Sequence, residues 1–270
     1  MPFFTHDETQ FHYQTEGSGV AFIFQHGLGA DVSQPFSLVR PPPGFRLLAF
    51  DTRDHGQTHP VSPPERLRFN TFAEDLVALL DHLDVQRAIV GGISMGAGVA
   101  LNFILRFPER ALGLVLSRPA WLDGPNPWNV KMFSLITRLI RDYGARRGEE
   151  LFKQTPEYQE LLQTTPEVAH SLALQFESPG VEETAFRLES IVRDAPNTSR
   201  EEWESIRVPT LVLANRQDPI HPFEYGEILA RHIPGAELKE ITAKSVSVER
   251  HNADVQGYVS DFLQRHFGCA

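Results

Sequence analysis

The sequence predicts an α/β fold, in which a mostly parallel central sheet is flanked by helices and carries an inserted helical segment. Three observations predict it. Apolar strand-like runs alternate with helix-like segments over residues 1–117. From residue 118 to residue 207 this alternation is replaced by helix-like segments that Pro and Gly interrupt, and it resumes over residues 208–270. Strands that alternate with helices build parallel sheets, because each return crossover contains a helix.

Each part of the chain has its own expected elements. Strands are expected near residues 10–15, 20–25, 45–50, 86–91, 111–117, 210–214 and 236–241. Helices are expected near residues 71–83, 95–106 and 223–232, with a final one ending near Phe267. The first of these helices has leucines at helical spacing, which is typical of a helix that packs on a core. We therefore expect residues 1–117 and 208–270 to form the core and residues 118–207 to form a helical lid, or cap.

Composition narrows the class of protein. A chain of 270 residues can bury a sizeable core, and its net charge of −10 opposes non-specific binding to nucleic acid. The single cysteine, Cys269, leaves no internal disulfide, and no Cys/His spacing indicates a zinc site. No apolar stretch is long enough to span a bilayer. We expect a cytoplasmic protein with no metal, cofactor, nucleic-acid or membrane partner; the oligomeric state does not follow from the sequence.

The segment Gly92-Ile93-Ser94-Met95-Gly96 has the G-x-S-x-G pattern. It follows an apolar strand-like run at residues 88–90 and precedes a helix-like segment at residues 97–106. In that strand–turn–helix context the pattern is typical of a nucleophile elbow, which presents the serine hydroxyl above the sheet. A glycine-rich turn that merely enters a helix is the alternative for this motif alone. Ser94 is the candidate nucleophile.

Two further segments fit a hydrolase. The strand-like run Val20 to Gln25 ends in His26-Gly27-Leu28-Gly29, and such a His-Gly loop supplies an oxyanion donor in this type of enzyme. The backbone N–H groups of Leu28 and Met95 are therefore expected to form the oxyanion hole. Asp218 follows the strand-like run at residues 210–214. A serine followed by an aspartate and then a late histidine is the chain order of these hydrolases.

The segments HGLGAD, FDTRDHG and GGISMGAG together resemble the α/β-hydrolase superfamily, and most closely its small esterase, enol-lactonase and perhydrolase branch. The resemblance covers nearly the whole chain and is weakest in its middle. It implies hydrolysis of a small carboxylic ester or lactone through an acyl-serine intermediate. Alternatives on the same fold are hydrolysis of a C–C bond and perhydrolysis or acyl transfer. A ligand-binding protein without catalysis is the alternative from another class.

The chain departs from this family at the general base. Members carry a histidine in the loop after the last strand, but residues 242–246 contain none, and Lys244 or Ser245 falls at that position. The next histidine is His251, and we expect it to be the base, with Asp218 as its orienting carboxylate. Alternatives are Lys244 as the base, a base from elsewhere such as His221, or no base at all.

Substrate-binding candidates lie at the beginning of the expected lid. The segment from Arg118 to Trp128 leaves the carboxyl edge of the sheet, where open α/β folds bind ligands. Trp121 and Trp128 are candidate pocket walls. Arg118 and Asn126 are candidate anchors for a substrate carboxylate or carbonyl, although pairing of Arg118 with a carboxylate of the protein is an equal alternative.

Overall fold

The computed structural model describes residues 2–268, so Cys269 lies outside the described residues. Its centre is an eight-stranded sheet, which confirms the predicted α/β class. The strands are β1 (Phe3–His6), β2 (Thr9–Gly17), β3 (Gly19–Gln25), β4 (Gly44–Phe50), β5 (Ala88–Ser94), β6 (Ala111–Pro119), β7 (Thr210–Ala214) and β8 (Glu237–Glu240). Within residues 2–268 no helix is both long enough and apolar enough to cross a bilayer.

The strand order is β1-β2-β4-β3-β5-β6-β7-β8. Pairing is antiparallel from β1 to β2 and from β2 to β4, and parallel from there to β8. The parallel strands β3, β5, β6 and β7 therefore end at one edge of the sheet, and the loops that follow them meet there. Strand β1 was not predicted, because four residues show too little alternation to indicate a strand.

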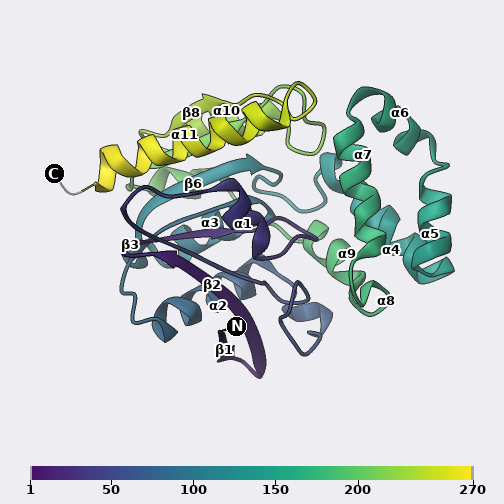
Figure 1. Cartoon of the computed structure of the whole chain (residues 1–270), viewed down its shortest axis with the longest axis horizontal. Helices are drawn as coiled ribbons and strands as arrows, with labels where there is room; N and C mark the ends of the chain where they lie inside the picture. The colour runs from purple at the N-terminus through teal and green to yellow at the C-terminus, as the bar shows by residue number, and fades with distance from the viewer. Residues whose placement is uncertain (1, 269–270) are drawn as a thin grey trace.

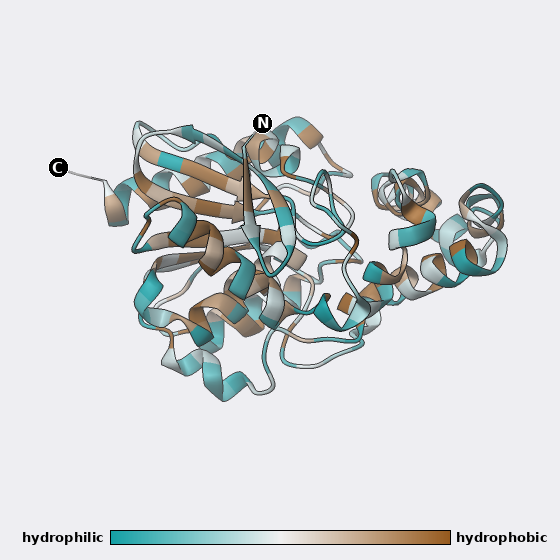
Figure 2. Cartoon of the chain, turned by 90° about the horizontal axis from the view of Figure 1, so that it is seen from below, coloured by the Kyte–Doolittle hydropathy of each residue, from teal (hydrophilic) through white to brown (hydrophobic). Residues whose placement is uncertain are grey.

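Helices cover both faces of the sheet (Figure 1). One apolar layer contains buried residues of α1 (Ser33–Leu38) and α11 (Val248–Phe267). The other layer contains buried residues of α2 (Phe69–His82), α3 (Met95–Arg106) and α10 (Phe223–His232). Figure 2 shows the hydrophobic strands enclosed between these helices. Two layers of this kind bury the sheet on both sides, as parallel strands require. The six-residue helix α1 was not predicted.

The segment between β6 and β7, residues 120–209, is called the helical insertion below. Its helices extend to one side of the sheet (Figures 1 and 2). They are α4 (Lys131–Tyr143), α5 (Ala145–Phe152), α6 (Pro156–Thr164), α7 (Pro166–Ala173), α8 (Val181–Thr184) and α9 (Phe186–Val192). Helix α4 buries Phe133, Ile136 and Ile140 on one face, which joins the insertion to the larger apolar layer. Its action as a lid, and the division of the chain into core and lid, stay predictions.

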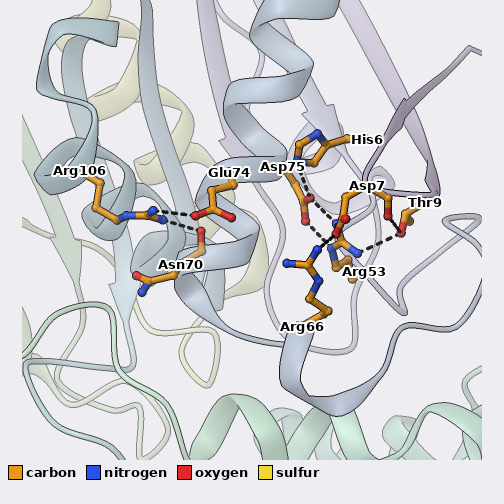
Figure 3. Close-up of polar contacts among 9 residues, drawn as sticks. All are labelled: His6, Asp7, Thr9, Arg53, Arg66, Asn70, Glu74, Asp75 and Arg106. Carbon is orange, nitrogen blue, oxygen red and sulfur yellow. Dashed lines mark hydrogen bonds and ion pairs between the residues drawn. The ribbon is translucent and has the colours of Figure 1, made fainter.

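A buried arginine joins three elements beside the sheet (Figure 3). Arg53, in the loop after β4, donates from Nε and Nη2 to the two oxygens of Asp75 on α2, each over 2.8 Å. Its Nη1 donates to Thr9 over 3.0 Å, and its Nη2 lies 3.2 Å from Asp7. The guanidinium is thus paired with carboxylates and closely packed, as a buried charge must be.

Candidate active site

Ser94 is the last residue of β5 and the N-cap of α3. Its φ of 57° and ψ of −115° lie in a sparsely populated region for a residue with a side chain. Glycines make the tight turn possible: a Cβ at Gly92 would lie 2.4 Å from the Gly96 backbone, and a Cβ at Gly96 would lie 2.3 Å from the Gln25 carbonyl oxygen. The chain therefore holds Ser94 in a strained strand-to-helix turn of the predicted kind.

Ser94 lines a cavity of about 120 Å³ at the carboxyl edge of the sheet. The walls come from the loop after β3, the ends of β5 and β6, helix α7 and the loops after β7 and β8. Leu28, Arg118, His221 and Lys244 are among the residues that face this space with Ser94. Residues far apart in the sequence thus surround one hydroxyl, at the edge where ligands bind in α/β folds.

Two neutral histidines hold the loop that carries Leu28. His26 Nε2 accepts from the Thr52 N–H over 3.1 Å, while its Nδ1 donates to the Gly27 carbonyl over 2.8 Å. His55 Nε2 accepts from the Gly29 N–H over 3.1 Å. Burial lowers the pKa of both rings, which keeps these nitrogens available as acceptors. The amides on either side of Leu28 are also occupied, since the Gly27 N–H donates to Gln34 over 2.8 Å.

His221, on the turn after β7, is paired with Asp218. Its Nδ1 lies 3.0 Å from both Asp218 oxygens, and its backbone N–H donates to Asp218 Oδ1 over 3.1 Å. A carboxylate only accepts, so Nδ1 carries the proton and Nε2 has the free electron pair. Within the described chain, Nε2 is buried and has no hydrogen-bond partner. His221 lines the same cavity as Ser94.

Arg118 completes the setting of Asp218. Its Nε donates to Asp218 Oδ2 over 2.8 Å, and its Nη2 lies 2.6 Å from the same oxygen. Nη2 is also 3.1 Å from His221 Nδ1, but the two carboxylate oxygens decide the tautomer because they carry the charge. Burial opposes ionisation of Asp218, yet Arg118 and His221 outweigh it and hold the pKa of that carboxyl far below its usual range. Burial also lowers the pKa of His221, so its ring is neutral at neutral pH.

His251 lies outside the Ser94 cavity but near enough to Arg118, Lys244 and Asp218 for their charges to act on its ring. It falls in the first turn of α11, which begins at Val248, and its Nδ1 lies 2.8 Å from the Thr242 carbonyl oxygen. It is fully buried and, in the part of the chain that the structure describes, neither hydrogen-bonds Asp218 nor lines the Ser94 cavity. Burial, with Arg118 next, lowers the pKa of His251 to about 4. Among the described residues the structure thus does not join His251 to Asp218 by a hydrogen bond, and the ring instead contacts the carbonyl of Thr242 in the preceding loop.

The remaining sequence candidates are scattered. Lys244 lines the Ser94 cavity, and burial lowers its pKa, but Ser245 is exposed and donates to Gln217 over 3.0 Å. Among the described residues, Trp121, Trp128 and Asn126 do not line this cavity. Trp121 is buried against Phe69, with ring centroids 5.5 Å apart, and Trp128 is 60% exposed. Of the four substrate-binding candidates, the structure therefore brings only Arg118 to Ser94, where it is paired with Asp218.

No described residues form a group of three or more His, Cys, Asp or Glu side chains arranged to hold a metal ion. The groups gathered around Ser94 include the His221 imidazole with its carboxylate, backbone amides, two cationic side chains and the carboxylate of Glu167. This set can move a proton between a hydroxyl and a neutral imidazole, and it can stabilise negative charge.

Comparisons with known proteins define the class. The family model for the alpha/beta hydrolase fold matches residues 20–245, and the chain belongs to that family. 3-oxoadipate enol-lactonase 2 of Acinetobacter baylyi is 27% identical over 253 residues, which cover 90% of this chain and 89% of the relative. The AB hydrolase superfamily protein YisY of Bacillus subtilis is 29% identical over 232 residues, covering 82% and 83%.

A solved structure agrees with this fold. The enol-lactonase from Burkholderia xenovorans LB400 has a TM-score of 0.74 at 23% identity, and the match covers 97% of this chain and 100% of that chain. The prediction of an α/β-hydrolase fold is confirmed by this structure and the family match, and the family match with its relatives confirms that the chain is a hydrolase-family enzyme.

The sequence did contain a signal for His221. Asp218 and His221 are three residues apart in a segment rich in turn-forming residues, Asn215 to Pro222. On such a turn an Asp side chain accepts from backbone amides two and three residues later, as Asp218 does from Ile220 and His221. That turn brings the imidazole back over its own carboxylate. Sequence analysis did not select this pairing, because the family carries its histidine one strand later in the chain.

Proposed function

We propose that the protein hydrolyses a carboxylic ester or lactone through an acyl-serine intermediate, with Ser94 as nucleophile and His221 as general base. The observation that supports this most is the His221 ring itself. Its Nδ1 is held by Asp218, its Nε2 has no hydrogen-bond partner within the part of the chain that the structure describes, and it lines the same cavity as Ser94. In this assignment Asp218 keeps its role as orienter, and His221 replaces His251 as the base.

The chemistry follows from the order of proton transfers. Nε2 of His221 accepts the Ser94 hydroxyl proton as Oγ bonds to the carbonyl carbon, so the carbonyl electron pair moves to oxygen. The backbone N–H groups of Leu28 and Met95 are the proposed donors to that oxyanion. Met95 is the first residue of α3, where amides lack partners within the helix. His221 then returns the proton to the leaving alkoxide, and water attacks the acyl-serine in the same way.

Relatives support the substrate class without fixing the substrate. A relative of similar length is named as an enol-lactonase, and a structural neighbour is described as degrading N-acyl homoserine lactone. The cavity of about 120 Å³ beside Ser94 suits a small acyl group. A small ester or lactone is therefore the proposed substrate of this chain.

Trapping of the intermediate tests the proposal. The protein is mixed with a small activated ester, quenched in acid within the first turnovers, digested and analysed by mass spectrometry. We expect the added acyl mass on the peptide that contains Ser94, and none in Ser94→Ala. Turnover without any acylated peptide would contradict the covalent route. Tight ester binding without turnover would instead favour a non-catalytic binder.

A further inference from the structure

A second, larger cavity of about 690 Å³ lies between the helical insertion and the core. Its core wall includes residues 29–34, 51 and 54–58, from the segments after β3 and β4, and its other wall includes residues of α8 and α9. Gln34 lines both this space and the Ser94 cavity, so the two are neighbours. Charged and polar side chains on both walls face the larger space.

The unusual member of these walls is Arg187 on α9. It is 3% exposed, and within residues 2–268 its only hydrogen bond runs from Nη1 to Thr184 Oγ1. It forms no ion pair within 4.0 Å in the described chain, and its buried Nε has no partner. Arg53 shows the ordinary arrangement, with two carboxylates around a buried guanidinium (Figure 3). Buried arginines are rarely left without such a counterion.

Asp54 presents the opposite charge from the core wall. It is 6% exposed, and its Oδ1 accepts from the Ser62 N–H over 2.7 Å; its Oδ2 is buried and has no hydrogen-bond partner among the described residues. Burial raises the pKa of Asp54 and lowers that of Arg187 to about 10. The two side chains influence each other electrostatically, yet they are too far apart to form an ion pair in this part of the chain.

We propose that this cavity binds a small organic acid whose carboxylate pairs with Arg187 and whose ammonium or hydroxyl group donates to Asp54. A guanidinium fork matches a carboxylate in shape and charge. A doubly charged phosphate is disfavoured, because Asp31, Asp51, Asp54 and Glu183 line the same space as Arg187. A ligand with both groups would satisfy an unpaired donor and an unpaired acceptor at once.

The ligand can be a separate small molecule or the distal part of the substrate, and the binding chemistry is the same in both cases. Binding at this cavity does not depend on the proposed hydrolysis. Isothermal titration with glycine, 3-aminopropanoate and 4-aminobutanoate tests it, because these zwitterions differ only in span. We expect one of the three to bind, and the matching hydroxy acid to bind more weakly. The alkanoate and alkylamine of that length should bind least.

Variants locate the site. Arg187→Met should abolish binding, and Asp54→Asn should remove the advantage of the amino acid over the hydroxy acid. Glu183→Gln is the matched control, since Glu183 lines the same cavity but is exposed, and it should bind like wild type. Ser94→Ala should also bind. Competitive inhibition of ester turnover by the bound acid would make the ligand part of the substrate, whereas no effect on turnover would make it a separate molecule.

Thermal unfolding supplies an independent readout. Without ligand, Arg187→Met should unfold at the same or a higher temperature than wild type, because it removes a buried charge that pairs with no carboxylate among residues 2–268. The rise in unfolding temperature that the bound acid causes in wild type should be lost. If Arg187→Met does not fold, Arg187→Lys is used instead in the binding and unfolding measurements. Absence of binding by wild type at millimolar concentration would overturn the proposal, and so would retained binding in both Arg187 variants.

Discussion

His221, in the loop after β7, and His251, in the first turn of α11, are both buried, and among residues 2–268 the Nε2 of each ring has no hydrogen-bond partner. His221 Nδ1 faces the Asp218 carboxylate, and the ring lines the cavity of Ser94. His251 Nδ1 faces the Thr242 carbonyl, and the ring packs at the beginning of α11. A base needs both a carboxylate to stabilise its charged form and access to the nucleophile. The comparison shows that surroundings, and not position in the chain, distinguish the two rings.

The largest effect should come from Ser94→Ala, and its loss of kcat is the reference against which the two histidine variants are compared. It removes the hydroxyl that the strained turn presents to the cavity, and kcat for a small ester should fall on the order of 10⁶-fold. Circular dichroism and the unfolding temperature should match those of wild type, since Ala fills less space. Activity within about tenfold of wild type, 1.4 kcal/mol in barrier, would end the acyl-serine proposal.

The two histidines are then compared directly. His221→Ala should lose nearly as much kcat as Ser94→Ala, and the double variant should lose little more, because nucleophile and base act as a unit. His251→Ala should stay within about tenfold of wild type in kcat, a change of about 1.4 kcal/mol. Its loss should appear in the free energy of unfolding, since a fully buried ring is removed. The reverse pattern of kcat values would restore His251 as the base and require the loop after β8 to rearrange.

Asp218→Asn tests the comparison further, because it removes the carboxylate beside Nδ1, which His221 has and His251 lacks. An amide can impose the wrong tautomer on His221, and kcat should fall about 10⁴-fold, as in serine proteases. Arg118 would also be left without its counterion, at a cost of roughly 3–5 kcal/mol in stability. Kinetics and urea unfolding of the same preparation separate the two effects. A stable variant with unchanged kcat would show that Asp218 does not orient the base.

Much of this site could be predicted from the sequence, because strand ends and glycines are local features. The elbow at Ser94, the loop at Leu28 and the position of Asp218 after β7 each follow from a few adjacent residues. The pairing of Asp218 with His221 and Arg118 depends on the orientation of these side chains within a buried cluster. The periodicity of apolar residues in the sequence does not indicate such orientations. Trp121 illustrates the same limit: its Pro/Gly-rich segment predicts a pocket wall, but the ring is buried against Phe69 of α2.

The pH dependence of kcat/KM offers a smaller effect that also separates the rings. The base must be neutral to accept a proton, so activity falls as pH decreases through its pKa. Burial lowers the pKa of His221 below 6.5, and the acid limb of the profile should therefore lie below pH 6.5. The profile should keep this limb in His251→Ala. A limb above pH 7 would contradict a buried neutral base and favour a group such as Lys244.

Lys244→Ala should have the smallest effect on kcat and completes the comparison, since Lys244 is the charged residue that the β8 loop does bring to the Ser94 cavity. Burial and Arg118 lower its pKa. A lysine serves as a base only when that lowering approaches neutrality, and the carboxylates of Asp218 and Glu167 oppose it. With His221 as the base, Lys244 contributes charge and not proton transfer, so kcat on a neutral ester should change less than about tenfold, or 1.4 kcal/mol.

Lys244→Arg, which keeps the charge, is the control and should match wild type on the same ester. A loss in Lys244→Ala as deep as that of Ser94→Ala, with His221→Ala nearly unaffected, would assign the base to the lysine and move the catalytic role from the loop after β7 to the loop after β8.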